Sequence, residues 1–138
     1  HLLHASSGMK EMTVPEVMRK NPVTVTGAKK TLECISLMNS KGIDSLIVTD
    51  DDGVFQGVVT IEAIRKKGRP GQAVGPLVNP DALTVPVSGT AKDAFDTLTG
   101  RTAEYLVVLD DKRRVTGIVT RTGMVKSMAE ALWGGEDS

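Results

Sequence analysis

Few side chains of this chain could do chemistry, and those that could are suited to binding rather than to bond breaking. The two histidines, His1 and His4, lie in an N-terminal stretch without hydrophobic periodicity, and we assign them no catalytic or metal role. The single cysteine, Cys34, sits among apolar residues at helical spacing and is expected to be a small buried hydrophobe. The sequence contains neither a convergent His, Cys, Ser or carboxylate set nor a Gly-x-x-x-x-Gly-Lys-Ser/Thr phosphate loop. The chain is therefore predicted not to be an enzyme.

Two further side chains stand out by their type and their position in the chain. Tyr105 is the only tyrosine and begins an apolar run, where its ring could stack on a base. Arg121 stands at the expected start of a helix, where free backbone N–H groups and a guanidinium can both meet phosphate. Plainer alternatives remain open, since Tyr105 fits a half-buried strand and Arg121 fits a surface or dimer ion pair.

Acidic residues gather at two further places, Asp50–Asp52 and Asp110–Asp111. Their spacing does not match a calcium-binding loop. Because Asp and Gly tolerate left-handed backbone, these runs are predicted to be hairpin turns.

The elements that must position these residues are written twice in the sequence. From Thr24 onward the two copies are offset by sixty residues, so that Thr24 corresponds to Thr84. A long period present only twice predicts two small domains packed as a pair rather than a solenoid. The matching segments are Ser45–Val48 with Tyr105–Val108, Asp50–Asp51 with Asp110–Asp111, and Gly57–Thr60 with Gly117–Thr120.

Hydrophobic periodicity predicts the order strand, helix, strand, strand, helix in each copy, an α/β (α+β) fold. In the first copy we expect a helix over Thr31–Lys41, capped by Thr31 or its neighbour and stopped by Gly42. Short helical lead-ins are expected over Val14–Met18 and Val74–Val78, one before each copy. The basic run Lys66–Gly71 breaks both periods and is expected to be a solvated connector.

Composition limits the partners. Among 138 residues, 17 basic and 17 acidic residues cancel, so no overall field recruits nucleic acid. No apolar run is long enough to cross a membrane, which predicts a cytoplasmic protein. We predict a tag or linker over 1–12, one motif over 13–68, a connector over 69–73 and a second motif over 74–135.

The repeated segments resemble tandem cystathionine-β-synthase (CBS) domains, also called a Bateman module. The resemblance runs from Val14 to about Trp133. It implies two βαββα motifs packed as a pseudo-two-fold pair, nucleotide binding in clefts between the copies, and a homodimer shaped as a flat disc. It rests on Val17-Met18, Asn21–Val25, Gly42–Val48 and Gly57–Thr60, and on Leu77-Val78, Leu83–Val85, Tyr105–Val108 and Gly117–Thr120.

One part of the family's nucleotide pattern is missing. That pattern ends in Gly, two hydrophobic residues, Ser or Thr, two variable residues and Asp, in which the hydroxyl meets phosphate and the acid holds ribose. Thr60 and Thr120 keep the hydroxyl, but Ala63 and Gly123 replace the acid. The missing acids argue against ordinary binding of AMP or ATP.

The stretch Thr60–Ile64 and the ending Ala131–Gly135 narrow the resemblance further. They look like the C-terminal regulatory segment of ATP-binding subunits of ABC transporters that import glycine betaine, carnitine or choline. The implied partners are a second copy, the parent ATPase domain and the transporter's membrane subunits, at the cytoplasmic face of the cell membrane. The implied ligand is the bacterial second messenger cyclic di-AMP, bound at the interface of a CBS dimer, and no cofactor is required. The implied contacts are Val23, Ile43, Ser45, Tyr105, Ile118 and Arg121, with Thr60 and Thr120 as further candidates.

Two other functions stay open. One is a general sensor of AMP, ADP or ATP, and the other is a structural dimerisation module without a small ligand. If cyclic di-AMP is the ligand, the resemblance implies inhibition of osmolyte import through a bias on the CBS dimer.

Overall fold

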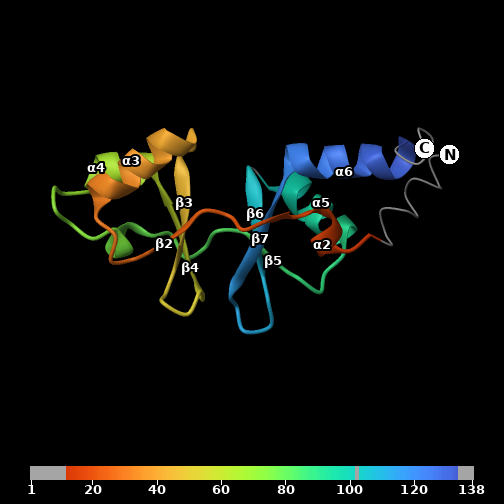
Figure 1. Cartoon of the computed structure of the whole chain (residues 1–138), viewed down its shortest axis with the longest axis horizontal. Coiled ribbons are helices and arrows are strands. Elements are labelled where there is room, and N and C mark those ends of the chain that lie inside the picture. Colours follow the sequence, from red (N-terminus) through yellow and green to blue (C-terminus); the bar gives the residue numbers. More distant parts are fainter. Residues whose placement is uncertain (1–11, 102, 134–138) are drawn as a thin grey trace. The chain divides into compact units, whose positions relative to one another are not determined.

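The computed structural model describes residues 12–101 and 103–133 and contains helices and strands in the order that the repeat predicts (Figure 1). A two-residue strand and a short helix precede the first copy, and a 3-10 helix precedes the second. The elements are α2 Val14–Val17, β1 Arg19–Lys20, β2 Thr24–Thr26, α3 Thr31–Lys41, β3 Ser45–Thr49, β4 Phe55–Thr60, α4 Ile61–Lys67, η1 Gly75–Leu77, β5 Thr84–Pro86, α5 Ala91–Gly100, β6 Tyr105–Leu109, β7 Val115–Thr120 and α6 Arg121–Trp133.

The sixty-residue offset holds at the level of structure. β5, β6 and β7 begin and end sixty residues after β2, β3 and β4, and α5 and α6 begin sixty residues after α3 and α4. Each copy therefore has the order strand, helix, strand, strand, helix, and the predicted mixed α/β fold is confirmed.

Contacts divide the chain into two compact units, and each is described by itself. Unit 2 consists of residues 22–82 and 112–115. Its sheet has the order β2-β3-β4, with β2 parallel and β4 antiparallel to β3. Helices α3 and α4 pack against each other and against this sheet (Figure 1). The core between them includes Cys34, Met38 and Val59, each with no exposed surface.

Among the described residues, unit 1 consists of 12–21, 83–101, 103–111 and 116–133. Its sheet has the order β1-β7-β6-β5, in which β1 is antiparallel to β7 and β5 is parallel to β6. Helices α2, α5 and α6 pack together, and their core includes Val14, Leu98 and Met124.

The units do not follow the repeat boundaries, because the lead-in of each copy packs with the other copy. In unit 1, the N–H of Val14 donates to the carbonyl of Gly89 at 3.1 Å. In unit 2, the N–H of Val74 donates to the carbonyl of Lys29 at 2.8 Å. Each unit is thus completed by a segment that precedes the other repeat in sequence, an exchange that the periodicity did not predict.

Two equivalent glycines allow this exchange. A Cβ at Gly57 would meet the carbonyl of Asn79 and the side chain of Val78, and Asn79 exchanges two backbone hydrogen bonds with Val58. A Cβ at Gly117 would lie 2.8 Å from the carbonyl oxygen of Arg19. The glycine of each Gly-hydrophobic-hydrophobic-Thr segment is therefore required by a backbone that passes over it.

The expected cap of α3 is wrong. The N-cap residue is Lys30, which makes no side-chain cap, and Thr31 is the first helical residue. Thr31 is buried, its hydroxyl donates to the carbonyl of Arg69 at 3.2 Å, and its N–H donates to the carbonyl of Gln72 at 2.9 Å. The hydroxyl and the N–H of Thr31 therefore both donate to carbonyls of the loop after α4, and the hydroxyl does not cap α3. At the other end the prediction is confirmed, because Gly42 closes α3 in the left-handed conformation with φ of 67°.

The start of the expected connector is also wrong. Helix α4 continues through Lys67, so Lys66 and Lys67 are helical. An ion pair of 2.8 Å between Lys66 and Glu62, one turn apart, and the basic last turn both favour the longer helix. The second lead-in is a 3-10 helix that contains Pro76 rather than an α-helix.

The tag or linker expected over 1–12 lies outside the described residues except for Met12. Within the described part of the chain, no helix is long and apolar enough to cross a membrane.

We predict that three glycine-to-alanine variants separate close approach from backbone strain. Gly42→Ala meets no neighbour and carries only the left-handed φ, which costs about 1 kcal/mol. Gly117→Ala meets Arg19 and Met18 and should cost about 1 to 3 kcal/mol. Gly57→Ala combines a close approach with φ of 145° and should cost about 3 kcal/mol or more.

Urea unfolding measures the three free energies under one set of conditions. Gly57→Ala as stable as Gly42→Ala would contradict the close approach of Asn79.

Candidate functional site

Four of the predicted site residues lie toward one end of the unit 2 sheet. Ser45 begins β3 and is the register partner of Thr60, the last residue of β4. Ile43 lies two residues before Ser45 and has 39% of its surface exposed. Val23 directly precedes β2, and because β2 runs parallel to β3, it lies near the same end. The strand ends therefore gather Val23, Ile43, Ser45 and Thr60.

The other four lie at the equivalent place in unit 1. Tyr105 begins β6 and is half-buried, and Thr120 ends the neighbouring strand β7. Ile118 is buried in β7, two residues before Thr120, and pairs with Arg19 of β1. Arg121 begins α6, as the sequence predicts. Each unit thus brings its own four candidates to a matching sheet end.

The two threonines have a structural task. The hydroxyl oxygen of Thr60 accepts from the N–H of Ala63 at 3.0 Å, and that of Thr120 accepts from the N–H of Gly123 at 2.9 Å. Both hydroxyls therefore cap the helix that follows, and the N–H groups they satisfy belong to the positions where the family carries its acid. A Cβ at Gly123 would lie 2.9 Å from the Thr120 hydroxyl oxygen, so a larger residue there would have to move this cap. Each capping hydroxyl keeps an O–H that could donate to a ligand oxygen.

The guanidinium of Arg121 is engaged with the protein backbone, which neither alternative in the sequence predicted. Its Nη2 donates to the carbonyls of Leu98 at 2.6 Å and Arg101 at 3.0 Å, and its Nε donates to the carbonyl of Ala103 at 3.1 Å. These carbonyls belong to the end of α5 and the chain that leads into β6. Arg121 is exposed overall, and a phosphate would have to share it with three carbonyls.

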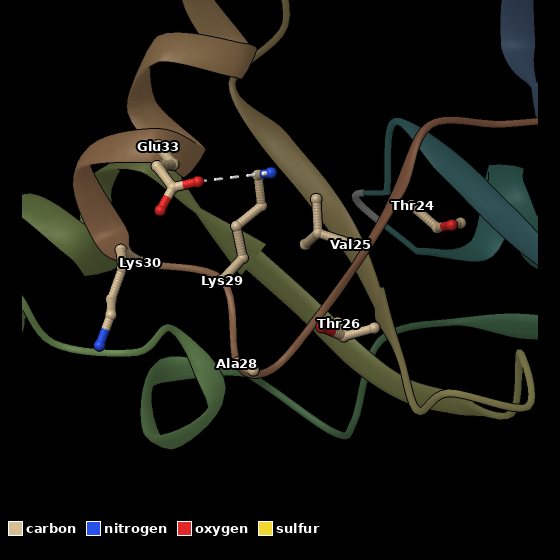
Figure 2. Close-up of a pocket in the computed structure, with 7 residues that line it drawn as sticks. All are labelled: Thr24, Val25, Thr26, Ala28, Lys29, Lys30 and Glu33. Atoms are coloured by element: carbon tan, nitrogen blue, oxygen red, sulfur yellow. Dashed lines mark ion pairs between the residues drawn. The ribbon is translucent and has the colours of Figure 1, made fainter.

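A shallow cavity that the sequence did not predict lies in unit 2, where β2 turns into α3. It has a volume of about 410 Å³ and is lined by residues of Thr24–Glu33, none of them a predicted contact. Figure 2 shows Lys29 directed toward Glu33, with which it forms an ion pair of 3.8 Å, while Lys30 points the opposite way. In the sequence, the feature that could have indicated this cavity is the pair of adjacent lysines, Lys29 and Lys30, just before α3.

Titratable chemistry is sparse in the described residues. Burial raises the pKa of the Cys34 thiol, so this cysteine remains a protonated core residue. The hydrogen bond to Asp96 raises the pKa of Lys92 on the surface of α5. Within 12–101 and 103–133, no group of three His, Cys, Asp or Glu residues is placed to hold a metal ion. The candidate residues can therefore bind a ligand through apolar contact, ring stacking and hydrogen bonding.

Both copies of the repeat match the model of a known domain family. The family model for the CBS domain matches residues 14–69 and again residues 74–130. The chain belongs to the CBS-domain family. The predicted tandem CBS architecture is therefore confirmed.

The curated relatives of this CBS pair include ATP-binding subunits of osmolyte transporters. It is 35% identical to the choline transport ATP-binding protein OpuBA of Bacillus subtilis, over 89% of this chain and 32% of that protein. It is 31% identical to the glycine betaine/carnitine/choline transport ATP-binding protein OpuCA of the same organism, over 91% of this chain and 33% of that protein. The chain thus spans about a third of these relatives.

Solved structures of CBS pairs share the fold. CBSX2 of Arabidopsis thaliana, solved in complex with AMP, superposes with a TM-score of 0.76 at 26% identity, covering 86% of this chain and 97% of that one. Staphylococcus aureus OpuCA superposes with a TM-score of 0.73 at 24% identity, covering 83% and 97%.

The capping threonines give a prediction about stability. Thr60→Ala and Thr120→Ala should each lower the free energy of unfolding by about 1 kcal/mol, because each leaves a first-turn N–H without its acceptor. Thr60→Ser and Thr120→Ser keep the hydroxyl and should stay within a few tenths of a kcal/mol of the parent, by the same ranking of N-cap residues. Denaturant titration compares the four variants. Equal losses in the serine and alanine variants would indicate that the threonine methyl group, and not the cap, is what matters.

Proposed function

We propose that this CBS pair is the regulatory part of the ATP-binding subunit of an osmolyte ABC transporter, and that it binds cyclic di-AMP at the interface of a CBS homodimer. The messenger lowers import of glycine betaine, carnitine or choline. The parent subunit works with the transporter's membrane subunits at the cytoplasmic face of the membrane.

The observation that carries the proposal is the match to transporter subunits along nearly the whole chain. Identity of 35% over 89% of the chain joins this CBS pair to a choline transport ATP-binding protein. Relatives named for carnitine transport in Listeria monocytogenes and glycine betaine transport in Bacillus subtilis match over similar lengths of the chain. The match covers only about a third of the first two relatives. We therefore propose, in addition, that an ATPase domain accompanies this CBS pair in the parent subunit.

The helix caps support a dinucleotide over an ordinary mononucleotide. A mononucleotide in the usual CBS cleft would need an acid for its ribose, and residues 63 and 123 are Ala and Gly. At residue 123 a Cβ would lie 2.9 Å from the Thr120 hydroxyl oxygen, so a side chain there would have to shift this cap. A ligand held through its bases and phosphates, with less dependence on ribose hydroxyls, suits these residues better.

The predicted contacts supply such a mode of binding. Tyr105 stacks on an adenine, a contact worth roughly 1 to 3 kcal/mol per base. Val23, Ile43 and Ile118 form apolar walls, and exposure of 39% at Ile43 leaves a hydrophobic side chain available to a ligand or a second copy. Ser45 donates a hydroxyl, while Thr60 and Thr120 add their O–H groups beside the helix starts. Arg121 provides positive charge close to the phosphates.

The mechanism is linkage between two equilibria. A symmetric ligand with two bases that bridges two copies favours one arrangement of the CBS dimer over others. In the parent subunit this preference opposes the closed ATPase dimer, so bound messenger and active transport each weaken the other. No step of bond making or breaking is assigned to this chain.

We predict that cyclic di-AMP raises the melting temperature of this chain, and that AMP and ATP do not. At one hundred times its dissociation constant a ligand adds about 2.7 kcal/mol, which for a chain of this size is a shift of several degrees. Tyr105→Ala should weaken binding roughly 5-fold to 150-fold because the ring contact is lost. Thermal melting followed by calorimetry measures both quantities.

Two substitutions at the same position serve as matched controls. Tyr105→Phe keeps the ring and should retain most of the affinity. Tyr105→Ser gives the second copy the residue that the first copy has at Ser45, and it should behave like Tyr105→Ala. Equal binding by all three variants would exclude the stacking contact.

A general adenine-nucleotide sensor is the second candidate, favoured by the AMP complex of CBSX2 at 26% identity. Stabilisation by AMP or ATP in the same melts would establish it in place of the messenger. A dimer that no nucleotide stabilises would instead indicate a structural dimerisation module.

The sign of regulation is tested in the complete transporter. With the parent subunit and its membrane subunits in vesicles, saturating cyclic di-AMP should lower osmolyte uptake at constant ATP. At a messenger concentration that just saturates the parent transporter, the Tyr105→Ala transporter should keep more of its uptake rate, because weaker binding leaves a larger share of its sites empty. An unchanged rate in the parent transporter, with binding verified, would refute inhibition.

A further inference from the structure

The two copies end their first long helix in different ways. Helix α3 closes on Gly42 in the left-handed conformation, where the N–H of Gly42 donates to Asn39 and the N–H of Ile43 donates to Met38. Helix α5 ends at Gly100, and the next residue, Arg101, is extended with φ of −133°. The residue directly after α5 is therefore extended, whereas the residue directly after α3 is left-handed.

A side chain from another helix donates to the end of α5. The Arg121 guanidinium donates to the carbonyls of Leu98, Arg101 and Ala103. A cation at the C-terminus of a helix is also favoured by the helix dipole. The residue that corresponds to Arg121 in the first copy is Ile61, which has no group to donate. The side-chain cap is thus specific to the second copy.

One of the three bonds from Arg121 reaches the approach to β6. Ala103 lies two residues before Tyr105, and Leu98 lies in the last turn of α5. A rigid, planar guanidinium thus holds the last turn of α5 and the residue two positions before β6 in one fixed geometry.

We infer that Arg121 is a positioning residue, which fixes the end of α5 and through it the placement of Tyr105. This inference rests on the proposed role of Tyr105 in ligand binding. The sequence could not distinguish a phosphate-binding arginine from a positioning arginine. Phosphate binding requires only the positive charge, whereas positioning requires the several N–H donors of the planar guanidinium.

Lysine distinguishes the two roles. Arg121→Lys keeps the positive charge and can meet phosphate as a point charge, but a single ammonium group cannot reproduce the planar fork of the guanidinium. If Arg121 positions Tyr105, Arg121→Lys should lose affinity for cyclic di-AMP about as strongly as Arg121→Gln, roughly tenfold or more. If the residue acts only as charge, Arg121→Lys should bind nearly as well as the parent chain.

The position of Tyr105 can be measured in the ligand-free chain, independently of whether cyclic di-AMP binds. Tyr105 is the only tyrosine, so its ring gives unambiguous NMR signals in the free chain. We expect these signals to shift or broaden in Arg121→Lys and Arg121→Gln, and to stay unchanged in Arg65→Lys, a control at an exposed arginine of α4. Unchanged Tyr105 signals in both Arg121 variants would overturn the inference.

The parent chain supplies a second test should the variants unfold. The Nε–H of Arg121, which donates to Ala103, should be protected from solvent exchange in the free protein. An Nε–H that exchanges as fast as that of Arg65 would show that the cap is not held and would overturn the inference. Failure of the parent chain to bind cyclic di-AMP would refute the proposed ligand alone, because both NMR measurements are made without it.

Discussion

At Gly57 and at Gly117 a neighbouring backbone segment passes too close for a side chain to fit. At Gly57 the neighbour is Asn79, and at Gly117 it is Arg19. Each neighbour belongs to the segment that precedes the other repeat. Because a side chain at either position would have to move that segment, the two glycines allow each unit to be assembled from parts of both copies. The repeat is therefore also an exchange of segments, in which neither copy is structurally complete in its own stretch of sequence.

The same Gly-hydrophobic-hydrophobic-Thr segment connects this constraint to the candidate site. Its glycine admits the exchanged segment, and three residues later its threonine caps the following helix and faces the sheet end where the candidate contacts gather. The first residue after the threonine then differs between copies, Ile61 in one and Arg121 in the other. A similar difference separates Ser45 from Tyr105 at the start of the paired strand. One scaffold thus carries an apolar, hydroxyl-bearing sheet end in unit 2 and an aromatic, cationic one in unit 1.

The sequence predicted the local structure well because local structure depends on local signals. Both strands of each hairpin and the left-handed stop at Gly42 followed from periodicity and turn chemistry. The errors come from contacts that the periodicity does not record, one between residues distant in sequence and one within a helix. Thr31 does not cap its helix because a loop about forty residues away takes its bonding groups, and α4 runs past the expected connector because its charges pair within the helix. The exchange of lead-in segments left no periodic signal, although the two equivalent glycines were visible. For the site, the sequence indicated which residue types could bind a nucleotide, and its threonines proved to be helix caps.

Arg121 illustrates why a resemblance can identify a residue without identifying its role. The family pattern selects the position, and the charge suggests phosphate, but the side chain donates to three carbonyls that no motif records. The reason lies at the end of α5, where Arg101 is extended and the carbonyls of Leu98, Arg101 and Ala103 accept from a side chain. In the first copy Gly42 closes α3 through the backbone, so residue 61 is free to be apolar. In the second copy the side chain of Arg121 donates to these carbonyls. A substitution of residue 121 therefore also affects the end of α5 and the approach to the strand that carries Tyr105. A change at residue 121 consequently alters the charge near a ligand and the scaffold around it together, and only substitutions that separate charge from donor geometry can assign its contribution.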